Sequence, residues 1–150
     1  SLPLKKFPPP EQLDAELAAL RAEADSARAA GKEEEFRLAS ALATQAGWRA
    51  GNAHQYFGQT TTEWPVQVVR IGDVALVSVA GEPFSSIGQR VIAASPFAHT
   101  LFSGYSNGGF GYIPERSAFA EGGYEIEATP FSEDAADVLV EQIGALLQRV

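Results

Sequence analysis

The segment VQVVRIGDVALVSV, residues 66–79, determines the fold that the sequence predicts. Two runs rich in β-branched residues, Val66–Ile71 and Val74–Val79, flank Gly72-Asp73, a pattern typical of a β-hairpin with a tight turn. The second run is apolar at five of its six positions. Because alternate side chains of a strand point to opposite faces, we expect both faces of this strand to be covered and the strand to be central in its sheet.

After residue 80 the sequence predicts helices and strands in alternation. Their order is a helix over residues 84–94, a strand over 99–105, a glycine-rich loop over 104–111, a short helix from Pro114 and a closing helix over 132–149. Ser95-Pro96 ends the first helix, because a residue before proline is driven out of the helical region. Ser132 is the expected N-cap of the closing helix, ahead of an acidic first turn.

Ahead of the sheet, the sequence predicts a proline-rich extension and a helical hairpin. Pro10 can occupy the first turn of one helix, Gly31 interrupts the apolar pattern, and Gly51-Asn52 is expected to end a second helix. We therefore divide the chain into residues 1–64 and 65–150. The predicted fold is α/β, a mixed sheet flanked by helices with an amino-terminal helical hairpin, in a single globular unit overall.

Composition excludes several classes of function. A net charge of −8 and a pI near 4.7 argue against nucleic-acid binding, which needs clustered Lys and Arg. The chain has no cysteine, so disulfides and thiol chemistry are excluded, and its apolar runs are too short for a membrane span or a signal peptide. Because the chain begins at Ser1 and contains no Met, we expect it to be a piece of a longer protein.

Glu82 follows the end of the predicted central strand. In open α/β sheets, side chains at this edge project into the crevice where ligands bind. The alternative is that Glu82 interacts with the dipole of the helix that follows. The later loop SGYSNGGFGY lacks the Lys and Ser/Thr of a phosphate-binding loop, so we expect it to let the backbone approach a ligand or metal closely.

The histidines do not predict a metal site by themselves. His54 and His99 are the two histidines of the chain, they lie far apart in sequence, and each is more typical of a structural histidine. Zinc in proteins usually takes three or four ligands from His, Cys, Asp and Glu. An ordinary zinc site made only from residues of this chain is therefore not expected.

From about residue 66 to residue 150 the sequence resembles the carboxyl-terminal half of the catalytic domain of neutral/alkaline non-lysosomal ceramidases, in particular their shorter bacterial relatives. Three motifs carry the resemblance: VAGEPFSSIGQR at 79–90, SNGGFGYIPER at 106–116 and GGYEIEATPF at 122–131. The closing helix also belongs to the resemblance. The helical hairpin before residue 66 resembles an insertion in the shorter relatives.

The resemblance implies roles for three residues. Glu82 matches the zinc-binding carboxylate of the family, and Tyr112 matches a tyrosine that is an unusual zinc ligand. Tyr124 lies twelve residues beyond Tyr112 and matches the tyrosine that donates a hydrogen bond to the oxyanion of the tetrahedral intermediate. In the family two histidine ligands come from the amino-terminal half, which is outside this chain, so the complete zinc site needs that missing half as a partner.

The activity that the resemblance implies is zinc-dependent hydrolysis of an N-acyl amide. The substrate can be a lipid such as a sphingolipid. We expect this chain to be inactive alone. Two differences from the ceramidases leave the acyl substrate open. Pro83 follows Gly81-Glu82 where the ceramidases have Phe, and Gly111 precedes Tyr112 where they have His. The resemblance favours a secreted or periplasmic location, which the residues themselves leave open.

Two other functions stay open at this point. The chain can be a non-catalytic binding or interaction module that uses the helical hairpin, with Glu82 and Tyr112 structural. It can also be a small hydrolase that uses carboxylates alone, with Glu82 and either Glu115 or Glu125 as an acid/base pair. Adjacent oxygens of Glu82 and Tyr112 would favour the zinc hydrolase over both.

Overall fold

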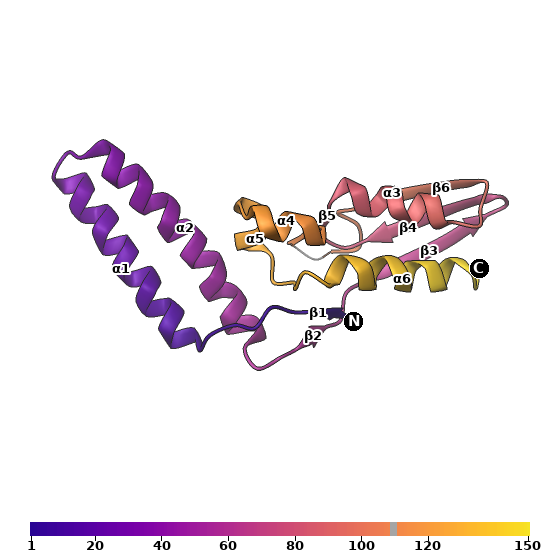
Figure 1. The fold of residues 1–150 in the computed structure, drawn as a ribbon, viewed down its shortest axis with the longest axis horizontal. Helices are drawn as coiled ribbons and strands as arrows, with labels where there is room; N and C mark the ends of the chain where they lie inside the picture. The colour runs from indigo at the N-terminus through magenta and orange to yellow at the C-terminus, as the bar shows by residue number, and fades with distance from the viewer. Residues whose placement is uncertain (109–110) are drawn as a thin grey trace. The chain divides into compact units, whose positions relative to one another are not determined.

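The computed structural model describes residues 1–108 and 111–150, which form two compact units (Figure 1). The hairpin unit is Lys6–Thr60, and the sheet unit combines Ser1–Lys5 with Thr61–Val150. Helices and mixed sheets follow a pair of amino-terminal helices, so the predicted α/β fold is confirmed. Gly109 and Phe110 of the predicted glycine-rich loop lie outside the described residues.

The hairpin unit consists of α1 (Pro10–Ala29) and α2 (Glu33–Tyr56), which lie side by side and antiparallel (Figure 1). Gly31, with a φ of 70°, makes the turn between them, a backbone conformation that favours glycine. The core at the open end of the hairpin combines small alanines with larger apolar side chains, namely Leu13, Ala50 and Ala53 with Phe7 and Leu17.

The predicted end of the second helix at Gly51-Asn52 is wrong, since α2 continues to Tyr56. A glycine inside a helix costs about 1 kcal/mol relative to alanine. The extra turns bury Ala53 completely and leave Tyr56 only 8% exposed. Packing against α1 therefore outweighs the local preference of glycine.

The main sheet has three strands in the order β3-β4-β6: β3 (Val66–Ile71), β4 (Val74–Val79) and β6 (His99–Ser103). β3 and β4 form the predicted antiparallel hairpin, and β6 pairs with β4 in parallel. The central position of β4 is confirmed. Helix α3 (Ser85–Ala94) connects β4 to β6 and packs against α6 (Ala135–Leu147), which also contacts β3.

The two faces of this sheet differ in burial. On β4, Ala75, Val77 and Val79 are at most 1% exposed and belong to the core. On the opposite face, Leu76 pairs with Val69 on one side and with Leu101 on the other. Val69 is 40% exposed and Leu101 60% exposed. A row of apolar side chains thus crosses the sheet on a face that stays open to solvent.

Two shorter sheets complete this unit. β1 (Leu2–Pro3) pairs antiparallel with β2 (Thr61–Thr62), and β5 (Glu82–Pro83) pairs in parallel with β7 (Tyr112–Ile113). Short helices α4 (Arg116–Glu121) and α5 (Tyr124–Ala128) follow β7. The first five residues, assigned by sequence to the amino-terminal extension, join this unit because Leu2 is buried at 1% exposure.

The start of the closing helix also differs from the prediction. Helix α6 begins at Ala135 with Asp134 in the N-cap position, and Ser132 does not cap it. The Ser132 hydroxyl is buried and has no hydrogen-bond partner among the described residues. Its backbone amide donates to Pro3 O at 3.1 Å, so pairing with the amino-terminal strand places Ser132 outside the helix.

A close crossing of backbones determines where β5 and β7 meet. Gly81 has a φ of +76°, and a Cβ atom there would lie 2.7 Å from Gly111 O and 2.9 Å from Trp64 Cζ2. The Trp64 indole is fixed in turn, because its Nε1 donates to Ala80 O at 2.7 Å. Any side chain at position 81 would therefore collide with two neighbours that cannot easily move.

We predict that Gly81→Ala destabilises the protein by about 2 to 5 kcal/mol, the sum of the left-handed backbone penalty and the overpacking cost. Urea unfolding would measure it. Gly72→Ala is the matched control, because Gly72 has a φ of +60° with nothing within 4 Å of its Cβ position. It should lose only the backbone penalty of about 1 to 2 kcal/mol. Equal losses in the two variants would contradict the crowding at Gly81.

Candidate functional site

The pairing of β5 with β7 places Glu82 directly opposite Tyr112. The Glu82 amide donates to Gly111 O at 2.9 Å, and the Phe84 amide donates to Ile113 O at 3.0 Å. Partners in register on adjacent strands present their side chains on the same face of the sheet. Two residues that are remote in sequence, predicted as ligands of one zinc ion, thus lie side by side.

A buried threonine also fixes the backbone of Tyr112. Thr129 is fully buried, its Oγ1 donates to Tyr112 O at 2.7 Å, and it accepts a hydrogen bond from the Phe131 amide at 3.1 Å. A buried hydroxyl with both of its bonds made holds its neighbours in one geometry. Thr129 is the residue that sets the backbone position of Tyr112, and sequence reasoning gave it no role.

Tyr124, the predicted oxyanion donor, lies against Tyr112. The two rings are 5.6 Å apart between centroids with an interplanar angle of 78°, an edge-to-face contact. Gly122 and Gly123 precede Tyr124 with φ values of 70° and 107°, so the chain turns sharply into α5 just before this residue. The structure therefore brings together Glu82, Tyr112 and Tyr124.

A third tyrosine joins this cluster, and sequence reasoning missed it. The Tyr105 hydroxyl donates to Glu82 Oε2 at 2.5 Å. Its backbone amide donates to Gly81 O at 2.7 Å, next to the crowded glycine. The available signal was the position of Tyr105 in the loop SGYSNGGFGY, but only the tertiary fold returns this loop to Glu82.

Tyr105 adopts a conformation that is rare for its residue type. Its φ is 53°, in the left-handed region, where a bulky residue is a genuine outlier. Such a conformation costs on the order of 1 to 3 kcal/mol. Burial does not offset that cost, because Tyr105 is 79% exposed. The contacts that hold it are the hydrogen bonds to Gly81 and Glu82.

The electrostatics of the cluster keep its phenols protonated. Partial burial, the charge of Glu82 and hydrogen bonds with Glu82 and Tyr124 raise the pKa of Tyr112 to about 12. The hydrogen bond to Glu82 is the main cause that raises the pKa of Tyr105. Near neutral pH both of these phenols thus hold their protons, and the Tyr105 hydroxyl donates to the Glu82 carboxylate.

The donor set matches part of a zinc site. Zinc takes carboxylate oxygens at about 2.0 to 2.2 Å, and the two donors predicted here are the carboxylate of Glu82 and the phenol of Tyr112. Glu82 and Tyr112 are partners on adjacent strands, so their side chains lie on the same face of the sheet. Over residues 1–108 and 111–150, His, Asp and Glu side chains nowhere gather in threes as a metal would require. The ligand roles of Glu82 and Tyr112 therefore stay predictions.

The two histidines belong to different units of the chain. His54 belongs to the hairpin unit, where its Nε2 is 2.9 Å from Asp14 Oδ2. His99 begins β6, pairs with Val74, and so lies at the opposite end of β4 from Glu82. Within the sheet unit, His99 therefore gives no ligand to the cluster.

The contacts of Glu115 do not support the carboxylate-only hydrolase. Glu115 forms an ion pair with Arg90 at 3.0 Å, and Arg90 also binds Asp137 at 2.7 Å. Hydrogen bonds with these two carboxylates raise the pKa of Arg90, and the one with Asp137 is the largest cause. Glu115 thus has a structural partner that ties α4 to α3 and α6, and Glu82 has tyrosines as its partners.

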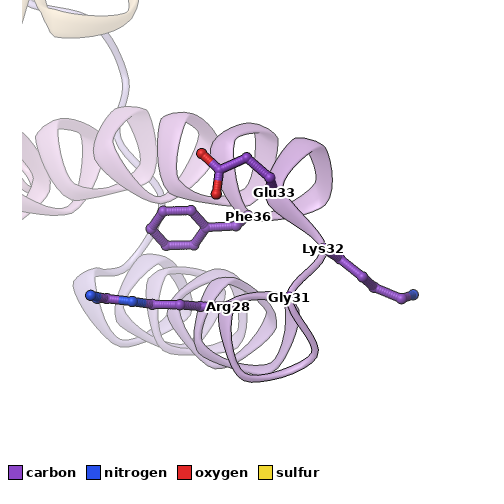
Figure 2. A pocket seen from close by; sticks show the side chains of 5 residues that line it. All are labelled: Arg28, Gly31, Lys32, Glu33 and Phe36. Atoms are coloured by element: carbon purple, nitrogen blue, oxygen red, sulfur yellow. The ribbon is translucent and has the colours of Figure 1, made fainter.

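A pocket of about 310 Å³ lies at the turn of the hairpin unit. Figure 2 shows the Phe36 ring between the two helices, with Arg28 extending along its own helix and Lys32 pointing away. The Arg28 guanidinium lies 5.7 Å from the Phe36 ring, and Glu33 pairs with Arg37 at 2.8 Å. The charged groups around this pocket therefore have partners within the hairpin itself.

No family model matches the chain, and no curated protein matches it. Among solved structures, the chain is similar to the neutral ceramidase from Pseudomonas aeruginosa, at 26% sequence identity and a TM-score of 0.45. The match covers 57% of this chain and 15% of the ceramidase, so the chain spans only a small part of that protein's length. Across the described residues, none of the helices has the length and apolar character needed to cross a membrane.

We predict that Glu82→Gln lowers the pKa of Tyr112 from about 12 toward the ordinary value of 10, because it removes the anion that opposes the phenolate. The ultraviolet absorbance of tyrosinate measures it, and Tyr112→Phe identifies the transition. Because the pKa of Tyr112 is raised in the folded protein, the protonated phenol contributes to the free energy of unfolding. That contribution is complete below pH 10 and is lost as the pH rises toward 12. An unchanged titration in Glu82→Gln would contradict the contact.

Proposed function

We propose that this chain is part of a zinc-dependent, ceramidase-like amidohydrolase that cleaves an N-acyl amide. The observation that supports it is the cluster of Glu82, Tyr112 and Tyr124, which lie together although 30 and 12 residues separate them along the chain. Each of the three motifs that resemble the ceramidases contributes one residue to this cluster. Its donors are oxygens alone, so the two histidine ligands would come from the amino-terminal half of the catalytic domain.

Each residue has a distinct role in this proposal. Glu82 and Tyr112 would hold the ion, which when bound supplies Lewis acidity and a water of lowered pKa. The Tyr112 phenol would lose its proton on becoming a ligand, because a metal favours the ionised donor. The Tyr124 hydroxyl would donate a hydrogen bond to the oxyanion that develops on the amide carbonyl.

The exposure of the cluster fits a shared site. Tyr124 is 50% exposed and Tyr105 is 79% exposed, so the cluster opens to the outside of the sheet unit. Electrostatic stabilisation of an oxyanion is strong only where water is excluded. We therefore propose that the missing half covers the cluster and forms the remainder of the cavity for the N-acyl amide or lipid. The chain alone should be inactive.

The open face of the main sheet is the proposed contact surface for the missing half. β4 and β6 pair in parallel, and parallel strands are normally covered on both faces. Here one face is covered by helices, and the other exposes Val69 and Leu101. An exposed apolar row of this kind marks an interaction site.

We expect zinc to bind stoichiometrically only when this chain is produced together with the sequence encoded upstream of it. Glu82→Ala or Tyr112→Phe should raise the zinc dissociation constant by more than about 100-fold. Loss of a residue that only hydrogen-bonds to a ligand typically reduces metal affinity by about 10- to 100-fold, so loss of a ligand itself should cost more. Metal analysis of the intact product and competition with a chelator measure this. Glu63→Ala, which removes an exposed carboxylate elsewhere, is the control and should bind zinc normally. Absence of zinc both from this chain alone and from the chain produced with the upstream sequence would contradict the proposal.

We expect Leu101→Glu to prevent association of this chain with the upstream sequence, because a charge on the apolar row would be buried without a partner. Co-purification of the two parts measures the effect. Leu38→Glu is the matched control, since Leu38 on α2 is 64% exposed. Association that survives Leu101→Glu but fails in Leu38→Glu would move the contact surface to the hairpin.

A second candidate function is a binding module that uses the hairpin. Leu38 and Leu42, four residues apart on one face of α2, are 64% and 41% exposed. This is the exposed apolar stripe that such a module needs, although it is short. If the upstream sequence brings no zinc and Leu38→Glu abolishes association, the binding module is the better function.

A further inference from the structure

Tyr105 is the residue of the cluster that the proposed function leaves unused. Its ring is exposed, so it does not serve the core, and its backbone conformation is one that glycine or asparagine would adopt at lower cost. A strained conformation persists only where the surrounding structure holds it, and such residues gather at functional sites. The contacts that hold Tyr105 end on Gly81 and on Glu82.

The geometry determines what this tyrosine can do for Glu82. A carboxylate has two oxygens, and the Tyr105 hydroxyl occupies Oε2 at 2.5 Å. The backbone of Tyr105 is tied to Gly81, the residue directly before Glu82, at 2.7 Å. The Tyr105 hydroxyl therefore has little freedom relative to Glu82. Because this hydroxyl occupies Oε2 of the carboxylate, Oε1 is available to bind an ion.

We propose that Tyr105 is a positioning residue, an outer partner of Glu82 that orients its carboxylate for the metal ion. This inference rests on the proposed function, since it assumes that Glu82 is a ligand. Carboxylates that bind metals are themselves hydrogen-bonded, and loss of such a partner typically reduces metal affinity by 10- to 100-fold. Tyr105 itself does not touch the ion or the substrate in this arrangement.

The position of Tyr105 also explains why a tyrosine is kept in a left-handed conformation. A shorter side chain at this position would relieve the backbone but could not extend to Glu82. Asn107, two residues further on, has a φ of 63° and makes a hydrogen bond from Nδ2 to Gln67 Oε1 at 3.3 Å. The loop thus carries Asn where an ordinary left-handed residue suffices, and Tyr where a long donor is needed.

The test compares Tyr105→Phe and Tyr105→Gly with the unsubstituted protein, each produced together with the upstream sequence. The zinc dissociation constant, from chelator competition, should rise by about 10- to 100-fold in both variants. The melting temperature of the metal-free protein should stay within about 2 °C in Tyr105→Phe, since the hydroxyl is at the surface. In Tyr105→Gly it should not fall, because the left-handed strain is relieved.

Tyr56→Phe is the matched control, since it removes a tyrosine hydroxyl from the hairpin unit, and its zinc affinity should equal that of the unsubstituted protein. A zinc affinity of Tyr105→Phe that lies within about three-fold of that of the control would overturn the positioning role. If Glu82→Ala still abolishes zinc binding, the proposed function is left intact. A fall in melting temperature in both variants would show that Tyr105 is structural. Absence of zinc from the unsubstituted protein would overturn both proposals.

Discussion

The candidate site depends on the close approach of the Gly81 and Gly111 backbones. A side chain at position 81 would meet Gly111 O at 2.7 Å, so the two segments can approach only because residue 81 is glycine. The crossing brings Glu82 into register with Tyr112. It also presents Gly81 O to the Tyr105 amide. One steric constraint thus positions three polar side chains, and a substitution that touches none of them would disperse all three.

Around this crossing, the cluster is built from weak and complementary contacts. Glu82 accepts a hydrogen bond from the Tyr105 phenol, and partial burial together with the charge of Glu82 raises the pKa of Tyr112 to about 12. In the proposed function, the negative charge of Glu82 would attract a metal cation to the cluster. Thr129 adds rigidity from the core side, where a buried hydroxyl fixes the Tyr112 carbonyl.

The incompleteness of the site and the openness of the sheet have a common explanation in the proposed function. Glu82 and Tyr112 need nitrogen ligands from elsewhere, and the apolar row of Val69, Leu76 and Leu101 needs a cover. A single missing half would supply both. In that arrangement the hairpin unit remains an accessory, and its exposed Leu38 and Leu42 keep open a separate role in binding a partner.

The sequence by itself determined the β-hairpin, the central position of β4 and the place of Glu82 at its end, because these follow from local patterns of apolar residues and from Gly72-Asp73. The resemblance to the ceramidases also pointed to Tyr112 and Tyr124, whose roles stay predictions. Prediction from the sequence failed at Gly51, where helix packing outweighs a local propensity, and at Ser132, whose amide pairs with the amino-terminal strand. Tyr105 and Thr129 could be assigned only from the tertiary structure. Their partners, Glu82 and Tyr112, lie 23 and 17 residues away, and no periodicity in a sequence encodes a hydrogen bond across such a distance.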